Sequence, residues 1–213
     1  MIENFLRAPQ SKAEITADVI RALGVLSVVL AVLFAELTDA GIIAFALPGL
    51  FAPRFLAVRA GADITLSVTL LIAAWSNVFD LYTSVPGWDL VVHFMATGVL
   101  AVGLYVLAIR AQLVSDPRAS LGSRIFGVAL TFALGLGLSA IWELVEWLGY
   151  LYITQGISIG YVDTIGDMAA GGAGALCAGL VVVISIREDR DGMQRPLRMT
   201  TTPRKGASWT QTS

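Results

Sequence analysis

The stretch "IFGVALTFALGLGLSAIWELVEWLG", residues 125–149, contains no basic residue and carries two acids near its end, Glu143 and Glu146. It is longer than the roughly 20 apolar residues with which an α-helix crosses the hydrocarbon core of a bilayer. The two carboxylates stand three residues apart, so they fall on one face of the helix. This stretch therefore predicts a membrane-spanning helix with two acids close to one membrane surface.

The composition of the whole chain agrees with a membrane protein. Of its 213 residues, 56% are hydrophobic and only 14% are charged, and the mean hydropathy is +0.77. Soluble domains carry about 25% charged residues, which excludes an ordinary soluble globule. We find no nucleic-acid-binding signature, and a single cysteine, Cys177, excludes an intramolecular disulfide. The sequence predicts an all-α, polytopic transmembrane helix bundle.

Six segments are candidates for crossing the membrane. They are residues 20–36, 41–56, 61–82, 88–109, 125–149 and 162–186. The second is short, and Pro48 and Pro53 interrupt it, so we expect a proline-broken span. Upstream of the first, Ser11 and Glu14 have the spacing of a capping box, which predicts that this helix begins near residue 12.

Basic residues are confined to alternate connections. Of the 14 Lys and Arg residues, 13 lie in segments 1–20, 53–60, 110–124 and 187–213, and Arg21 lies at the inner end of the first span. The segments near 37–40, 83–87 and 150–161 hold none. Because basic residues favour the cytoplasmic side, this asymmetry predicts six spans with both termini inside. If segment 41–56 did not cross, basic residues would fall outside, so we expect it to cross.

The chain divides into three parts. We expect a cytoplasmic N-terminal segment over residues 1–19, a single transmembrane domain over 20–186, and a disordered basic cytoplasmic tail over 187–213. Within the transmembrane domain, "GDMAAGGAGALCAG" (166–179) is rich in small residues, which indicates a face for close helix packing.

Acidic residues gather at the predicted outer surface. Six carboxylates and the only histidine lie within about two helical turns of it. They are Asp80, Asp89, His93, Glu143, Glu146, Asp163 and Asp167. No Lys or Arg on this side can pair with them, so either protons or a bound cation must neutralise them. We predict one outward-facing site formed by Asp89, His93, Glu143, Glu146, Asp163 and Asp167, and leave Asp80 open.

Single members of this set also have structural interpretations. Asp89 and Asp163 stand in first turns, where acids cap helices and favour the helix dipole. His93 alone is typical of a hydrogen-bonded buried histidine. Asp167 lies one turn deeper than Asp163, and carboxylates at such depth usually face a polar interior.

The motifs "WDLVVHF" (88–94), "WELVEW" (142–147) and "YVDTIGDMAAGGAG" (161–174) resemble the YjdF-like family of uncharacterised bacterial inner-membrane proteins. The resemblance covers most of residues 40–186, including "LPGLFAPRFL" (47–56), and is looser toward VanZ-like proteins. It implies a multi-pass protein of the bacterial inner (cytoplasmic) membrane and the same six site residues. It implies no activity.

Three function classes remain open from the sequence. The first is a metal-dependent enzyme acting on an envelope or lipid-linked substrate, with Mg²⁺, Mn²⁺, Fe²⁺ or Zn²⁺ bound by carboxylates and one imidazole. Glu143 and Glu146 would be ligands or a general base, and His93 a ligand or proton carrier. The second is a proton- or cation-coupled transporter, in which Asp63 continues a path inward. The third is a non-catalytic membrane scaffold.

Overall fold

The computed structural model describes residues 2–157 and 159–185, all of the regular structure being helical. The elements are α1 (Ile2–Leu6), α2 (Lys12–Phe34), α3 (Leu37–Phe55), α4 (Ala60–Val78), α5 (Leu81–Ser84), α6 (Trp88–Arg110), α7 (Leu121–Tyr152) and α8 (Tyr161–Ser185). The all-α bundle that the composition predicts is confirmed. The tail predicted over 187–213 lies outside the described residues.

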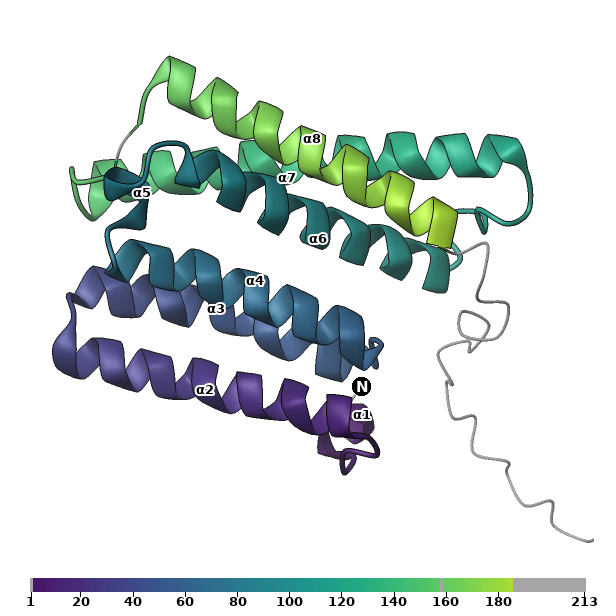
Figure 1. The fold of residues 1–213 in the computed structure, drawn as a ribbon, viewed down its shortest axis with the longest axis horizontal. Helices are drawn as coiled ribbons and strands as arrows, with labels where there is room; N and C mark the ends of the chain where they lie inside the picture. Colours follow the sequence, from purple (N-terminus) through teal and green to yellow (C-terminus); the bar gives the residue numbers. More distant parts are fainter. Residues whose placement is uncertain (1, 158, 186–213) are drawn as a thin grey trace, which may run out of the picture.

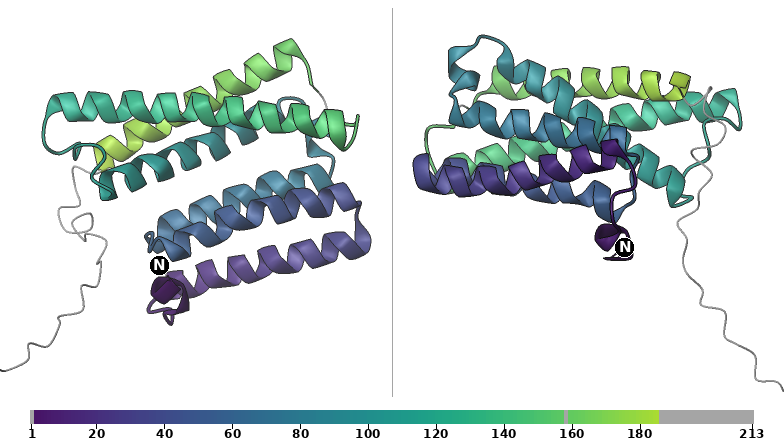
Figure 2. Two further views of the ribbon diagram at one scale, coloured as in Figure 1. Left: turned by 180° about the vertical axis from the view of Figure 1, so that it is seen from behind. Right: turned by 60° about the horizontal axis from the view of Figure 1, so that its bottom comes forward.

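The long helices form two units of three. Helices α2, α3 and α4 pack on one another, and so do α6, α7 and α8 (Figures 1 and 2). Helix α4 packs on α6, and the short α5 contacts both, so α4–α6 joins the two units. We call the end of the bundle that carries α5 the acidic end, and the end that carries α1 the basic end (Figure 1).

Helix boundaries follow local signals in the sequence. Helix α2 begins at Lys12, where the Ser11 hydroxyl accepts a hydrogen bond from the Glu14 amide at 3.2 Å, as the capping-box spacing predicts. Helix α4 ends at Val78 rather than continuing to residue 82, because Asp80 adopts a left-handed conformation with φ 51°. The chain then turns through α5 before α6 begins.

Among the helices of residues 2–157 and 159–185, five are long and apolar enough to cross a membrane, namely α2, α4, α6, α7 and α8. Helix α3 is not among them by hydropathy, although its 19 residues match the length of α4 and it lies between α2 and α4 (Figure 1). Pro48 and Pro53 lie inside this one helix and do not divide it, so the expected break is not seen. The crossing of α3, and hence the number six, stays a prediction.

The second unit is closely packed through small residues. A Cβ added at Gly174 would overlap the backbone carbonyl of Phe94 on α6, and one added at Gly135 would overlap Ala175. Gly98 approaches the Gly174 backbone in the same way from the other side. The segment of small residues on α8 is therefore a helix-packing face, which allows α6 and α7 to pack closely against α8.

Topology can be tested by cysteine accessibility. In a Cys177→Ala background, a single cysteine at Ser84, the last residue of α5, should react with an impermeant reagent from outside the cell. A cysteine at Ser115, between α6 and α7, should react only after permeabilisation, because Arg110, Arg118 and Arg124 flank it. Both serines are exposed, so burial does not confound the labelling. Labelling of residue 115 from outside would overturn the orientation.

Candidate metal centre

Three helices bring acidic side chains together at the acidic end. Asp89 and His93 lie in the first two turns of α6, Asp167 lies in the second turn of α8, and Glu143 and Glu146 lie on α7. Helix α7 continues for about two turns beyond Glu146, to Tyr152, so the glutamates are not at its very end as expected. The spacings of four on α6 and three on α7 put the two members of each pair on one face of their helix.

Five of the six predicted residues converge. Potential ligand atoms of Asp89, His93 and Asp167 all lie within 4.8 Å of one another, and so do those of His93, Glu143 and Glu146. His93 belongs to both groups and therefore stands at their centre. His93 is 6% exposed and Asp167 2% exposed, so the two groups meet inside the unit rather than on its surface.

The polar atoms around His93 are only partly satisfied. Its Nε2 lies 3.4 Å from Oδ1 of Asp89. The indole N–H of Trp142 donates a hydrogen bond of 2.8 Å to Oε1 of Glu146. Oε1 of Glu143 is buried and has no hydrogen-bond partner among the described residues. A buried carboxylate oxygen without a donor is energetically costly.

Two acids of the predicted surface cluster lie apart. Asp163 is exposed in the first turn of α8, and it belongs to neither ligand group although it is close enough to interact electrostatically with Asp89 and Glu143. Asp80 is exposed, precedes α5 and likewise belongs to neither group. Asp163 was expected among the converging residues, whereas Asp80 had been left open.

A packed layer lies one helical turn below the cluster. Thr97 follows His93 by four residues, Ser139 precedes Glu143 by four, and Gly171 follows Asp167 by four. The Thr97 and Ser139 hydroxyls are 3.4 Å apart and buried, and a Cβ at Gly171 would overlap the Ser139 hydroxyl. This floor closes the cluster toward the middle of the bundle.

Tyr82 is a neighbour of the cluster that was not among the site residues predicted from the sequence. Its hydroxyl donates a hydrogen bond of 2.8 Å to the Ala73 carbonyl, and it is close enough to interact electrostatically with Asp89 and Glu146. Burial, together with those two carboxylates, raises the pKa of the Tyr82 hydroxyl above its ordinary value, so Tyr82 stays protonated. The only feature of the sequence that could have placed Tyr82 near the cluster is its position in the connection between two predicted spans.

Asp63 does not continue the cluster inward. It lies near the start of α4 in the other three-helix unit, where it is buried and forms an ion pair with Arg21 of α2. The role of a path residue that the sequence suggested for Asp63 in a transporter is therefore not supported, because a guanidinium partner already compensates its charge.

Comparison with known proteins places the chain in a membrane family. The family described as predicted membrane protein (DUF2238) matches residues 16–189, a range that includes α3 to α8 and all but the first turn of α2. The match supports an uncharacterised membrane family; it does not test the name YjdF-like and gives no support to the VanZ-like resemblance. No curated protein and no solved structure matches the chain.

Proposed function

The chain belongs to the predicted membrane protein (DUF2238) family. We propose that it is an integral membrane protein with a divalent-cation site, and that it is an enzyme whose reaction depends on the bound metal. The ligands would be Asp89, His93, Glu143, Glu146 and Asp167, with Asp163 at the entrance. We propose the bacterial inner membrane as its location, with the acidic end outside, and an envelope or lipid-linked substrate.

The observation that carries this proposal is the convergence of four carboxylates on one imidazole without a basic partner. The segments that form the acidic end, residues 30–45, 79–96 and 139–171, contain no Lys or Arg. Four carboxylates within reach of one another repel, and His93 can offset one charge at most. A divalent cation would neutralise them and would supply the partner that the buried Oε1 of Glu143 lacks.

The donor set limits the choice of metal. Carboxylate oxygens and one imidazole nitrogen suit Mg²⁺, Mn²⁺, Fe²⁺ or Zn²⁺, and no thiolate is present among these residues to favour a softer ion. Asp89 would also orient His93, since its Oδ1 lies 3.4 Å from Nε2 of the imidazole. The bound cation would act as a Lewis acid toward an oxygen of the substrate.

The residues proposed for catalysis are Glu143, Glu146 and His93. The hydrogen bond from Trp142 holds Glu146 in place, and one of the two glutamates would accept a proton from an attacking water. An acidic site repels an anionic substrate unless a cation lies between them, so a phosphoryl-containing lipid head group would be recognised through the metal rather than through side chains.

The floor of the cluster favours an enzyme over a transporter. Thr97, Ser139 and Gly171 fill the space between the three helices one turn below His93, and Gly98 and Gly174 pack backbone to backbone beyond them. An ion transported through the bundle would have to separate these closely packed helices. A site near one end of the bundle that is closed toward its middle suits chemistry on a substrate from the outer leaflet.

Calorimetric titration of chelator-treated protein with Mg²⁺, Mn²⁺ and Zn²⁺ tests the proposal. We expect saturable binding of at least one ion at neutral pH and weaker binding on acidification, because protons compete for the carboxylates and the imidazole. Absence of saturable binding to all three ions at neutral pH would reject the metal site. Binding that is unchanged between pH 7 and pH 5 would reject carboxylate and imidazole ligands.

A further inference from the structure

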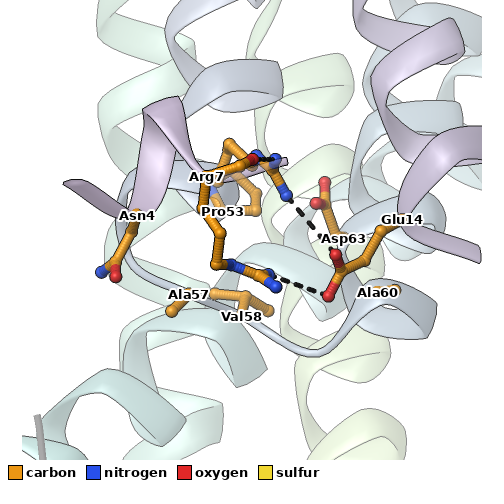
Figure 3. A pocket seen from close by; sticks show the side chains of 9 residues that line it. Asn4, Arg7, Glu14, Pro53, Ala57, Val58, Ala60 and Asp63 are labelled. Carbon is orange, nitrogen blue, oxygen red and sulfur yellow. Dashed lines mark hydrogen bonds and ion pairs between the residues drawn. The ribbon is translucent and has the colours of Figure 1, made fainter. Parts of the chain in front are cut away.

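Carboxylates at the basic end of the bundle are balanced by arginines. Figure 3 shows Arg7 and Glu14 pointing toward one another beside a cavity that Asp63 also lines. Arg7 and Glu14 are 2.9 Å apart and belong to a larger network of ion pairs. The network joins three acids, Glu14, Asp18 and Asp63, with three bases, Arg7, Arg21 and Arg54. It carries no net charge, so the side chains of the protein are sufficient to neutralise it.

The acidic end has no such balance. Its two ligand groups contain four carboxylates, and the segments that form this end contain no Lys or Arg. Asp167 is 2% exposed, and none of the ion pairs among the described residues includes it. A buried carboxylate without a partner is energetically costly. One divalent cation would leave two of the four negative charges uncompensated, since a neutral His93 contributes none.

The potential ligand atoms form two groups that a single ion does not join. One group contains Asp89 and Asp167, the other contains Glu143 and Glu146, and His93 belongs to both. Within each group the atoms lie within 4.8 Å of one another, and no group of the described residues contains all five side chains. Opposite ligands of one octahedral ion lie about 4.2 Å apart, twice the Mg²⁺–oxygen distance. Two adjacent ions therefore fit this arrangement better than one.

His93 can serve only one of two ions. A neutral imidazole offers one nitrogen lone pair, because its other nitrogen carries a proton. Oδ1 of Asp89 lies 3.4 Å from Nε2 of His93, where it is placed to accept that proton and to orient the ring. The lone pair then remains for the ion of the two glutamates. Asp89 is 32% exposed, so a second ion can reach its carboxylate from solvent.

We propose that this cluster binds two divalent cations, which together hold a phosphate group of the substrate. The first ion lies at Glu143, Glu146 and His93, and the second lies at Asp89 and Asp167. This inference rests on the proposed function and adds to it a second ion and a class of substrate, a phosphate ester. The second ion has two carboxylates and no imidazole, and phosphate oxygens complete the coordination of ions held in this way. Paired ions about 3.5–4 Å apart are a common device for binding such esters.

Titration of the chelator-treated, full-length protein with Mn²⁺, followed by calorimetry and by electron paramagnetic resonance, tests the number of ions. We expect two Mn²⁺ per chain, the second bound more weakly because it lacks the imidazole and is repelled by the first. At saturation the spectrum should be that of two spin-coupled ions, because ions about 4 Å apart interact magnetically. One Mn²⁺ per chain with the spectrum of an isolated ion would overturn the second ion and leave the proposed function standing. Absence of any bound Mn²⁺, Mg²⁺ or Zn²⁺ would reject both.

Glycerol phosphate is the probe for the phosphate group. Because it would contact both ions at once, we expect it to strengthen the binding of the second Mn²⁺ by about fivefold or more. Glycerol without phosphate should have no effect. An unchanged affinity for the second ion in the presence of glycerol phosphate would overturn phosphate as the bridging group.

Asp167→Asn separates the two ions. Asparagine keeps the shape of the side chain and removes its charge, so the number of bound Mn²⁺ should fall from two to one and the spin coupling should disappear. The affinity for the first ion should stay within about tenfold, the lower limit for changes near a metal ligand. Asp80→Asn removes an exposed acid of the same end that belongs to neither group, and it should keep both ions. Two ions in folded Asp167→Asn, or one in Asp80→Asn, would overturn the assignment.

Discussion

Replacing Glu143 and Glu146 together by glutamine is expected to abolish divalent-cation binding, with a loss in affinity above about 100-fold. Changes in residues that merely orient metal ligands cost about 10- to 100-fold, and this double change removes two charged ligands directly. Glutamine keeps the shape of each side chain, and the loss of two mutually repelling carboxylates should not unfold the bundle. Titration calorimetry with the ion that binds the unmodified protein measures the change.

Asp80→Asn is the matched control for this double variant. Asp80 is an exposed acid at the same end, outside both ligand groups, and asparagine tolerates its left-handed backbone. We expect its affinity for the cation to stay within about twofold of the unmodified protein, since a screened surface charge contributes little. If the folded double variant binds the cation as the unmodified protein does, Glu143 and Glu146 are not ligands.

Gly174→Ala is expected to destabilise the protein by about 1–3 kcal/mol or more, because overpacking of a close helix contact cannot be relieved by a side-chain rotation. The added Cβ would overlap the carbonyl oxygen of Phe94, a backbone atom, so α6 and α8 would have to separate. Because α6 carries His93 and α8 carries Asp167, the same change should weaken cation binding. Thermal unfolding in detergent, followed by size exclusion, measures the first effect.

Gly137→Ala provides the control on α7. A Cβ at Gly137 would meet no atom within 4 Å, and alanine favours a helix interior over glycine by about 1 kcal/mol. We therefore expect unchanged or slightly higher thermal stability. Similar stability of Gly174→Ala and Gly137→Ala would mean that α6 and α8 do not approach as closely as their glycines indicate.

Local patterns in the sequence were sufficient for the class of fold and for most helix positions. Hydropathy over a window of one bilayer thickness located the long helices, and Ser11 predicted the start of α2 because a cap acts within one turn. The boundary at Val78 was missed, since the left-handed turn at Asp80 lies within an apolar run that reads as helix. The continuity of α3 through Pro48 was missed because proline usually ends a helix interior.

For each residue of the candidate site, the sequence predicted the distance from the membrane surface but not the direction in which the side chain points from the helix axis. The distance of a residue from the end of its helix follows from a rise of about 1.5 Å per residue, so the sequence placed Asp89, Glu143 and Asp167 near one surface. Whether they meet depends on how each helix is rotated about its axis, and contacts between distant residues, such as Gly174 with Phe94, set that rotation.

Asp63, Asp163 and Asp167 show what the tertiary structure alone decided. Asp163 and Asp167 share a helix face, yet Asp163 is exposed and Asp167 is 2% exposed, because only the deeper one reaches the contact with α6 and α7. Asp63 pairs with Arg21, 42 residues away, which no local pattern indicates. The amino-acid sequence by itself determined a helical membrane bundle with unpaired acids at one end; the packing of small residues between α6, α7 and α8 decided which acids face one another.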